Sequence, residues 1–535
     1  MRSLVDILEY HRRTKHRPDA YAKGPASIDW EAQPDPFRRY DGCDIVALPL
    51  EGMQAPSTWA SLWQDSGDRS LTTVRDVGCL LELSLALSAW KQYGGSSWSL
   101  RVNPSSGNLH PTECYVLASG VDGLVDGVYH YRADLHALEL RCCFTSVNSD
   151  SPSLALGFTS VHWREAWKYG ERAFRYCQHD VGHALASVSY AAATLGVNAA
   201  DIRPLMITDD ELAALTGIDR AEDYPEGAEA EHPDCLITLS GGKSGSLTGS
   251  DWLSLAQQGS WKGIANVLDR RHFYEWDVIE EAAQATRILE RPAPDHPEYC
   301  ETPAIISQGI RATDKAAQII YQRRSAQAFD QSAGAISQQT FFTLLDHTLA
   351  RRHCPPWNAL PSVNGINLFV FVHKVDGLKP GLYALIRDAE SSEFQNRMRE
   401  QFVWESVDGA PEHLGLYCLL NAGTQRTAAN ISCQQAIAGD SAFSLGMLAD
   451  MRGLEAEPYQ YRQLFWQAGA IGQTLYLDAE AEGLRGTGIG CYYDDFMHDL
   501  LGLSAEDYQV LYHFTVGVPL TDHRITTWRP YQERR

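Results

Sequence analysis

The residues best suited to bind a flat, polar ligand lie in the segment Asn103–Glu113, NPSSGNLHPTE. Small residues between two prolines let the backbone approach a ligand closely, and their hydroxyls and amides can bond its polar edge. The apolar run Cys114–Ala118 follows directly and predicts a strand. The same residue types also form ordinary turns, so a tight turn before a strand is the competing interpretation. The candidate ligand contacts of this loop are Pro104, Ser105, Ser106 and Asn108.

A second candidate is the segment Gln322–Phe329, QRRSAQAF, at the end of a predicted helical run. The guanidinium groups of Arg323 and Arg324 could bind a phosphate bidentately, because their paired N–H donors match its oxygens. Ser325 and Gln327 could hold hydroxyl groups beyond that phosphate. The alternative is a solvated basic turn, which an Arg-Arg pair alone does not exclude.

Two further segments of the second half could complete a phosphate site. Gly483–Gly490, GLRGTGIG, offers backbone N–H groups at close approach, with Gly488 and Gly490 as the candidates. The segment lacks the GxGxxG spacing and follows a helix, so it does not imply a dinucleotide-binding fold. Val516–Pro519 ends a predicted strand and leads to Arg524, another candidate partner for phosphate.

Composition excludes several classes of protein. The chain has 535 residues, too many for one ordinary core, and 44% of them are hydrophobic, as in a packed globular protein. The 45 basic and 68 acidic residues give a net charge of -23, which disfavours nucleic acid and anionic membrane surfaces as partners. The 12 cysteines contain no CxxC pair, so a disulfide scaffold or a zinc ribbon is disfavoured.

The sequence also predicts where the protein resides. No apolar run approaches the roughly 18 residues that a membrane span needs. The N-terminal segment lacks the apolar stretch of a secretory signal. We therefore expect a soluble, cytoplasmic protein.

The second half of the chain repeats features of the first. Val121–Tyr129 matches Val375–Tyr383, and the loop at Pro104 has a partner in Pro361–Asn364 before another apolar strand. The repeat predicts an α+β fold of two tandem domains, each an antiparallel-type sheet around a central buried helix. The two domains are expected to pair as an intramolecular pseudo-dimer. The intervals between Arg175, Gly182 and Gly196 recur in Arg462, Gly469 and Gly483.

Periodicity and turn residues divide the chain into four parts. These are an extended N-terminal arm (1–65), a first domain (66–245), a connecting segment (246–300) and a second domain (301–535). The Gly/Ser-rich stretch Gly241–Ser250 is typical of a linker. Within the first domain we predict helices over Val74–Trp90 and from about Trp163 to Leu195.

Two of these segments carry a resemblance to a known family. Pro104–Pro111 and Trp163–Cys177, WREAWKYGERAFRYC, resemble the SagB/ThcOx-type dehydrogenase branch of the FMN-dependent nitroreductase superfamily. The second half, with Arg323–Ser325 and Gly488–Gly490, resembles the same superfamily more loosely. Together the resemblance covers most of residues 70–530.

The resemblance implies a shared FMN site. In the family, an Arg-Ser segment and a C-terminal arginine hold the ribityl phosphate, and the Pro-Ser loop of the other protomer meets the flavin ring. Here one complete site would combine the second-half candidates with the loop at Pro104. The reciprocal site would rely on Arg13–His16, Pro361–Ser362 and Gly196–Ala199, which depart from the family pattern. We therefore expect one FMN per chain.

The resemblance also implies the chemistry. In azoline-oxidising members a Lys-Tyr pair before the long helix is catalytic, and Lys168 and Tyr169 occupy that place. The implied function is an FMN-dependent dehydrogenase or oxidase in which flavin N5 accepts hydride from a substrate while Lys168 or Tyr169 moves a proton. The substrate would be an azoline in a modified peptide or a related small molecule. Surface packing by the Lys-Tyr pair is the competing interpretation.

Two other functions stay open. The protein could instead reduce nitro, quinone or enone compounds with NAD(P)H, or it could be a flavin-binding scaffold without catalysis. A metal site at His179 and His183, spaced i,i+4, is disfavoured because no third ligand is evident. Asp494 and Asp495 are interpreted as a helix cap, and no sequence feature marks the thiol of Cys491 as reactive.

Overall fold

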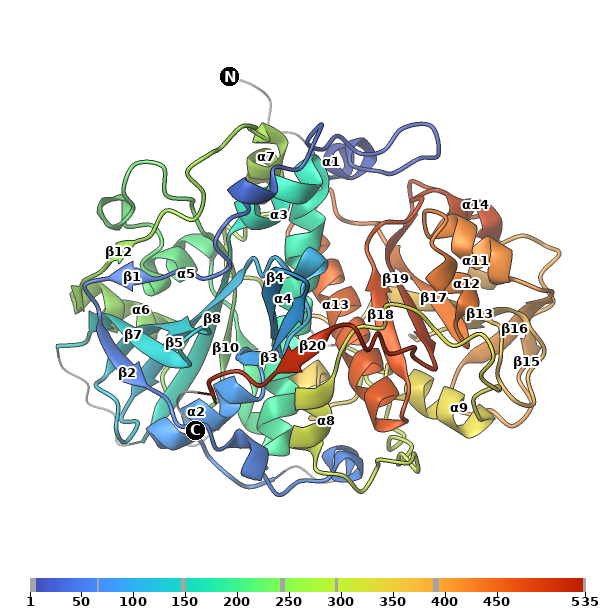
Figure 1. Cartoon of the computed structure of the whole chain (residues 1–535), viewed down its shortest axis with the longest axis horizontal. Coiled ribbons are helices and arrows are strands. Elements are labelled where there is room, and N and C mark those ends of the chain that lie inside the picture. Colours follow the sequence, from blue (N-terminus) through green and yellow to red (C-terminus); the bar gives the residue numbers. More distant parts are fainter. Residues whose placement is uncertain are drawn as a thin grey trace.

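Two antiparallel sheets lie on either side of a pair of long helices, α4 (Ala173–Thr194) and α13 (Gln460–Ala481) (Figure 1). The computed structural model describes residues 6–64, 67–145, 151–240, 246–293, 297–387 and 394–532. The first part of the predicted linker, residues 241–245, lies outside these ranges. No described helix is both long enough and apolar enough to cross a membrane.

The first sheet is built around β5, which directly follows the loop at Pro104. Every residue of β5 and of its neighbour β8 is buried, so the sheet is covered on both faces. This burial explains why the strand lacks an alternating polar pattern. The strand order is β11 (Ser260–Trp261), β7 (Ala137–Cys143), β6 (Gly127–Arg132), β5 (Thr112–Ser119), β8 (Ser153–Ser160), β10 (His232–Thr238), β9 (Arg203–Leu205), and β2 (Asp44–Ala47) also pairs with β7.

The second sheet has the same arrangement. Its central strand β13 follows the Pro361 loop, as β5 follows the loop at Pro104. The strand order is β15 (Glu405–Ser406), β16 (Leu416–Asn421), β14 (Gly381–Leu385), β13 (Ile366–Val372), β17 (Phe443–Asp450), β19 (Tyr508–Gly517), β18 (Arg485–Ile489). From β7 to β9 and from β16 to β18 the two orders correspond strand by strand, as the internal repeat predicts. The fold is mixed α+β with antiparallel sheets.

Helices α4 and α13 approach closely at a glycine of each. A Cβ on Gly182 would lie 2.1 Å from the carbonyl oxygen of Trp466, and one on Gly469 would lie 2.2 Å from that of His179. No side chain fits at either position, so glycine permits the contact. The recurring intervals in the sequence therefore have a packing reason: both glycines lie where the two buried helices meet.

Equivalent ion pairs tie each helix to the opposite half. Arg175 on α4 contacts Asp494 at 2.6 Å, and Arg462 on α13 contacts Asp209 at 3.0 Å. Asp494 also binds Arg172 at 2.9 Å. The two arginines hold the pKa of Asp494 well below its usual range despite burial. The interpretation of Asp494 as a helix cap is wrong, because its carboxylate binds these two arginines. Asp495 does occupy the N-cap position of α14 (Phe496–Leu501), although its side chain makes no capping hydrogen bond.

The two termini cross to opposite halves. The C-terminal strand β20 (Thr526–Trp528) pairs with β3 (Leu87–Tyr93) of the first half, which pairs with β4 (Ser96–Arg101). Near the N-terminus, His16 N–H donates to Asp494 at 2.7 Å, and His11 bonds Tyr461 at 3.1 Å. A terminal segment of each half therefore packs against the other half.

Three predicted elements differ in the structure. The helix predicted over Val74–Trp90 ends at Glu82 as α2 (Val74–Glu82), and β3 begins at Leu87. The helix predicted from Trp163 is divided at Gly170 into α3 (His162–Tyr169) and α4. The segment 246–300 contains helices α6 (Gly249–Gln258) and α7 (Asp277–Ala285), and Trp252 of α6 is buried in the core beside the first sheet.

The remaining described α-helices and strands are short (Figure 1). They are α1 (Ile7–Arg13), β1 (Tyr40–Asp41), α5 (Asp209–Thr216), β12 (Ile264–Ala265), α8 (Ala316–Gln322), α9 (Gln338–Asp346), α10 (Phe394–Arg397), α11 (Gln425–Ile431), α12 (Ala436–Asp440) and α14 (Phe496–Leu501).

Candidate functional site

A cavity of about 770 Å³ lies between the two halves. This volume is within the range of small-molecule and cofactor sites, roughly 300–1,000 Å³. Both halves contribute to its wall, as does β20. The predicted residues that line it are Pro104, Ser105, Ser106, Asn108, Tyr169, Arg323, Arg324, Ser325, Gln327, Gly488 and Gly490.

The loop at Pro104 is held in an uncommon backbone conformation. Gly107, Asn108 and His110 have φ values of 59°, 62° and 53°, in the left-handed region. Hydrogen bonds within the loop hold this shape: His110 N–H donates to Ser105 Oγ at 2.8 Å, and the Asn108 amide donates to the Ser99 carbonyl at 2.9 Å. Positive φ at asparagine and histidine costs free energy and persists where surrounding contacts enforce it. The loop is therefore a defined wall of the cavity.

Asp180 on α4 is hydrogen-bonded to the loop at Pro104. Its carboxylate accepts hydrogen bonds from the backbone N–H of Ser106 at 3.0 Å and from the Ser106 hydroxyl at 3.0 Å. Burial raises the pKa of Asp180 to about 7, against the lowering effect of these bonds. Because Asp180 also lines the cavity, its proton occupancy near neutral pH changes the charge of the wall.

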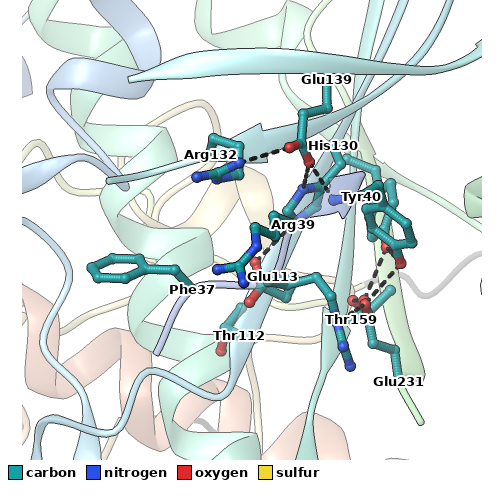
Figure 2. A network of polar contacts seen from close by, with 12 residues as sticks. Phe37, Arg39, Tyr40, Thr112, Glu113, His130, Arg132, Glu139, Thr159 and Glu231 are labelled. Carbon is teal, nitrogen blue, oxygen red and sulfur yellow. Dashed lines mark hydrogen bonds and ion pairs between the residues drawn. The ribbon is translucent and has the colours of Figure 1, made fainter. Parts of the chain in front are cut away.

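A buried polar network connects the loop to α3 and to the first sheet, and Figure 2 shows its members Glu113, His130 and Glu139. Arg164 on α3 donates to the His110 carbonyl at 2.8 Å and pairs with Glu113. Glu113 bonds His130 at 3.1 Å, which bonds Glu139 at 3.0 Å. Burial opposes the charge of His130, but the two carboxylates outweigh it and raise its pKa to about 9. The helix bearing Lys168 and Tyr169 is thereby held against the loop.

Lys168 and Tyr169 lie against the tip of the loop. A Cβ on Gly107 would lie 2.5 Å from Tyr169 Oη and 3.1 Å from Lys168 Nζ. Tyr169 lines the cavity and Lys168 does not; Lys168 Nζ lies 5.9 Å from the ring of Trp30, an exposed residue of the N-terminal arm. Burial and the nearby Glu165 raise the pKa of Tyr169. At neutral pH the Tyr169 phenol is therefore protonated and can act as a hydrogen-bond donor.

Four cationic side chains of the cavity wall lie within electrostatic reach of one another: Lys91, Arg323, Arg324 and Arg485. Arg323 donates to the Val102 carbonyl at 3.2 Å, and Arg324 donates to the Tyr321 carbonyl at 2.9 Å. Burial and the neighbouring Arg323 lower the pKa of Arg324 to about 10. Glu480 is shared by Arg485 at 3.7 Å and Arg311 at 3.2 Å. The cluster carries excess positive charge and suits a phosphate group.

Hydroxyl and backbone groups adjoin the cationic cluster. The Tyr476 hydroxyl bonds Ser325 Oγ at 2.9 Å and accepts from the Gly488 N–H at 2.9 Å. Ser325 and Gly488, which were predicted from separate segments, are thus connected through one tyrosine. This arrangement joins the end of α8 to β18 at the cavity.

Arg524 lies outside the cavity lining. Its side chain is 71% exposed and pairs with Asp522 at 2.7 Å. Arg172 and Arg175, which follow Lys168 in the sequence, bind Asp494. The structure therefore separates Arg524 from the predicted phosphate contacts.

Sequence reasoning missed several lining residues. Lys91 follows a stretch that was predicted as helix, and Arg485 was noted only as part of a glycine-rich turn. Asp180, which follows His179 in the sequence, was not among the candidates for the cavity. Lys91 could have been found only by recognising Leu87–Tyr93 as a strand. The β-branched and aromatic content of this run is too low to distinguish a strand clearly from a helix. Among the described residues, no group of three or more His, Cys, Asp or Glu side chains could hold a metal ion.

The equivalent region beside Pro361 is nearly filled. The space lined by Pro361, Asp234 and Trp466 is about 20 Å³. Ser362 accepts a hydrogen bond from Gln467 at 3.3 Å. The Arg13–His16 segment lies elsewhere: Arg13 pairs with Glu171 and Lys15 pairs with Asp495, both at 2.5 Å, and it does not line the space beside Pro361. The structure therefore does not bring the predicted parts of the reciprocal site together.

Comparisons with known proteins identify the fold. Residues 320–518 match the model described as "Nitroreductase family". The protein MJ1384 of Methanocaldococcus jannaschii, a nitroreductase by assignment, is 28% identical over 134 residues, which is 23% of this chain. The chain spans 65% of the length of this curated relative.

Solved structures extend the similarity to nearly the whole chain. A protein from Anabaena variabilis ATCC 29413, also a nitroreductase by assignment, aligns over 96% of this chain and 99% of its own, with a TM-score of 0.69 and 22% identity. The E. coli microcin synthetase McbBCD complex with truncated pro-MccB17 bound aligns over 38% of this chain and 70% of its own, at 17% identity. Its TM-score of 0.28 is too low to support an argument. The chain has the nitroreductase fold, and residues 320–518 match the sequence model of the nitroreductase family.

Proposed function

We propose that the protein is an FMN-dependent oxidoreductase with its site in the large cavity between the two halves. The observation that carries this proposal is the convergence of two motifs on one space. The loop at Pro104 comes from the first half and the Arg323–Ser325 segment from the second, yet both line the same cavity. The match of residues 320–518 to the nitroreductase family model supports the choice of cofactor.

The residues present fit FMN. Lys91, Arg323, Arg324 and Arg485 would hold its phosphate, because their charges are only partly balanced by Glu480. Ser325 and Gln327 would bond the ribityl hydroxyls, and the loop with Ser105 and Ser106 would face the ring. When bound, FMN supplies the capacity to accept or donate a hydride.

The chain's own residues would position the substrate and move protons. Tyr169, protonated at neutral pH, can donate a hydrogen bond or relay a proton to a group bound against the loop. Lys168 can exchange a proton with the same region, since its Nζ lies beside Gly107. Asp180, whose pKa lies near 7, can accept the proton that these groups release.

The finer proposal concerns the direction of the reaction. The placement of Lys168 and Tyr169 at the loop favours a dehydrogenase or oxidase of the azoline-oxidising type, acting on an azoline in a modified peptide or on a related small molecule. A second candidate, a reductase of nitro, quinone or enone compounds that uses NAD(P)H, is favoured by the similarity to MJ1384. The same cavity would serve both reactions. The electron donor, an azoline or NAD(P)H, distinguishes the dehydrogenase from the reductase.

An anaerobic experiment tests the proposal. The protein is saturated with FMN, freed of excess flavin, and mixed with NADH, NADPH or a thiazoline-containing peptide while absorbance near the flavin maximum is recorded. We expect FMN to be retained and bleached by the azoline, with the matching azole as product. Bleaching by a nicotinamide alone would establish the reductase, and failure to retain FMN would contradict both.

A further inference from the structure

Two cysteines lie together at the wall of the cavity. Cys433 lies in the turn between α11 and α12, and Cys491 lies two residues after the end of β18. Both are free and partly exposed, and Cys491 lines the large cavity. They are 58 residues apart in the sequence, so the pair does not form a CxxC motif.

Hydrogen bonds hold the two cysteine-bearing segments in register. Tyr493 N–H donates to the Ile431 carbonyl at 2.8 Å. The Gln435 amide donates to the Cys491 carbonyl at 2.9 Å and to the Ser432 carbonyl, also at 2.9 Å. Because Tyr493 bonds residue 431 and Cys491 bonds residue 435, the segments that carry Cys433 and Cys491 lie side by side, and the two thiols interact electrostatically.

The turn that presents Cys433 is conformationally unusual. Cys433 and Gln434 have consecutive φ values of 51° and 61°, in the left-handed region. Residues other than glycine adopt this conformation infrequently, and it persists where surrounding contacts enforce it. In this turn Gln434 donates to the Tyr493 hydroxyl at 3.3 Å, which ties the segment of Cys433 to that of Cys491.

The surroundings favour a thiolate at Cys491. Hydrogen bonds from Cys433 and His16, together with the charge of Arg172, lower the pKa of Cys491 in spite of burial. The same contact raises the pKa of Cys433. By contrast, burial raises the pKa of Cys114 and of Cys177. Cys491 is also the member of the pair that lines the cavity, so it is placed to attack an external disulfide, and Cys433 behind it is placed to resolve the product.

We propose that Cys433 and Cys491 form a redox-active dithiol–disulfide pair that exchanges with low-molecular-weight disulfides. The Cys491 thiolate attacks one sulfur of the external disulfide, forms a mixed disulfide with it, and displaces the other sulfur as a thiolate. The Cys433 thiol then loses its proton to solvent and attacks the Cys491 sulfur, which releases the second external thiolate. The external disulfide gains two electrons, and the cysteine pair loses them.

Access to the pair exists from two sides. Cys491 is open to the cavity, where it lies within electrostatic reach of Tyr169 and Tyr176. On the outer side Cys433 contacts Tyr21, a residue of the N-terminal arm that is 54% exposed. The exchange uses no flavin, so it is independent of the proposed oxidoreductase function.

Oxidised glutathione is the probe for this proposal. The full-length protein is reduced, freed of reductant, incubated with oxidised glutathione, alkylated and digested for mass spectrometry. We expect two thiols to be lost together and a disulfide-linked peptide pair containing Cys433 and Cys491. The Cys433→Ser variant should stop at a glutathione mixed disulfide on Cys491, since it lacks the resolving thiol.

Matched variants separate this pair from general thiol reactivity. Cys300→Ser, which removes another partly exposed cysteine, should leave the exchange unchanged. Cys491→Ser should slow the reaction of Cys433 by about tenfold or more, because the attacking thiolate is gone. The proposal is overturned if the wild-type protein forms no Cys433–Cys491 link while Cys300 reacts, and that result needs no variant to fold.

Discussion

At the scale of single residues, the cavity combines two kinds of contact. One part of its wall is cationic, with Arg323 and Arg324 bonded mainly to backbone carbonyls. Another part consists of small residues held in an enforced loop. A ligand with a phosphate at one end and a planar polar group at the other would contact both the cationic wall and the loop. The phosphate contacts can therefore be tested separately from the contacts to the planar group.

Arg324→Ala should weaken FMN binding more than riboflavin binding. A charge-assisted hydrogen bond contributes about 1.5–3 kcal/mol, so the Kd for FMN should rise by about 10- to 100-fold. Riboflavin has no phosphate, and its Kd should change little. Fluorescence titration of both ligands measures the difference. Arg524→Ala is the control, since this exposed arginine lies outside the cavity; an equal loss for both ligands in Arg324→Ala would contradict the assignment.

Lys168→Ala should impair turnover without releasing the cofactor. If Lys168 moves a proton, its loss should slow substrate-dependent flavin bleaching by about 10²- to 10⁴-fold, while the Kd for FMN stays unchanged. Stopped-flow absorbance gives the rate and titration gives the affinity. Lys379→Ala, which removes an exposed lysine, serves as the comparison. Unaltered bleaching by NADPH in Lys168→Ala would instead favour the reductase.

Asp180→Asn should alter the pH dependence of stability. Burial raises the pKa of Asp180 to about 7 in the folded protein, from about 3.9 when unfolded. Below the unfolded pKa the carboxyl is protonated in both states, so its ionisation costs no folding free energy. Above that pKa the unfolded state is favoured by ionisation, and the free energy of unfolding falls by up to ~1.4 kcal/mol per pH unit until pH 7. Asparagine does not titrate, so the melting temperature of the variant should gain on the wild type from pH 4 to 7 and level off above. A difference in melting temperature between the variant and the wild type that does not change with pH would contradict the raised pKa of Asp180.

Residue types alone could predict the segments that line the cavity but not all of their partners. Pro104, Ser105, Arg323 and Arg324 were recognisable because loop and guanidinium chemistry is local. The separation of Arg524 from the cavity was not predictable, because its ion pair with Asp522 depends on the path of the chain after β19. The contact between Cys433 and Cys491 likewise requires tertiary structure.

At the scale of elements, the packing of α4 against α13 sets the distance between the halves. Both helices are almost entirely buried, so their small residues govern how closely they approach. Residues from both helices line the cavity, including Asp180 and Tyr476. A change at the crossing should therefore affect both stability and the site.

Gly182→Ala should destabilise the protein and weaken FMN binding. The added Cβ would lie 2.1 Å from the Trp466 carbonyl oxygen, so the helices must separate. Overpacking of a core typically costs about 1–3 kcal/mol. Urea unfolding and FMN titration measure the two effects. Gly334→Ala is the control, because nothing lies within 4 Å of its Cβ position; equal stabilities of the two variants would contradict the account of the crossing.

Sequence periodicity predicted the existence of elements better than their ends. The apolar pattern from Val74 continues through Leu85 and Leu87, so it does not mark the end of α2 at Glu82. The division of the predicted long helix at Gly170, with φ 56°, depends on the close approach of Lys23 and Gly24. At Gly170 a tertiary contact overrides a helical pattern. The central strands β5 and β13 were predictable because each is a continuous apolar run.

At the scale of the whole molecule, the two halves share a strand order but differ in their cavities. The space beside the loop at Pro104 is about 770 Å³, whereas the space beside Pro361 is about 20 Å³. Strand β20 reaches across to β3 and adds Thr527 to the wall of the large cavity. An internal repeat in the sequence predicted two similar halves, but the filling of one space depends on side chains that no local pattern identifies.

The number of FMN molecules bound per chain tests the central claim most directly. The protein is saturated with FMN, separated from free flavin, and heated to release the ligand for quantification by absorbance against protein concentration. One FMN per chain is the predicted result, because one cavity combines the cationic cluster with the loop at Pro104. Two FMN per chain, or none, would contradict it.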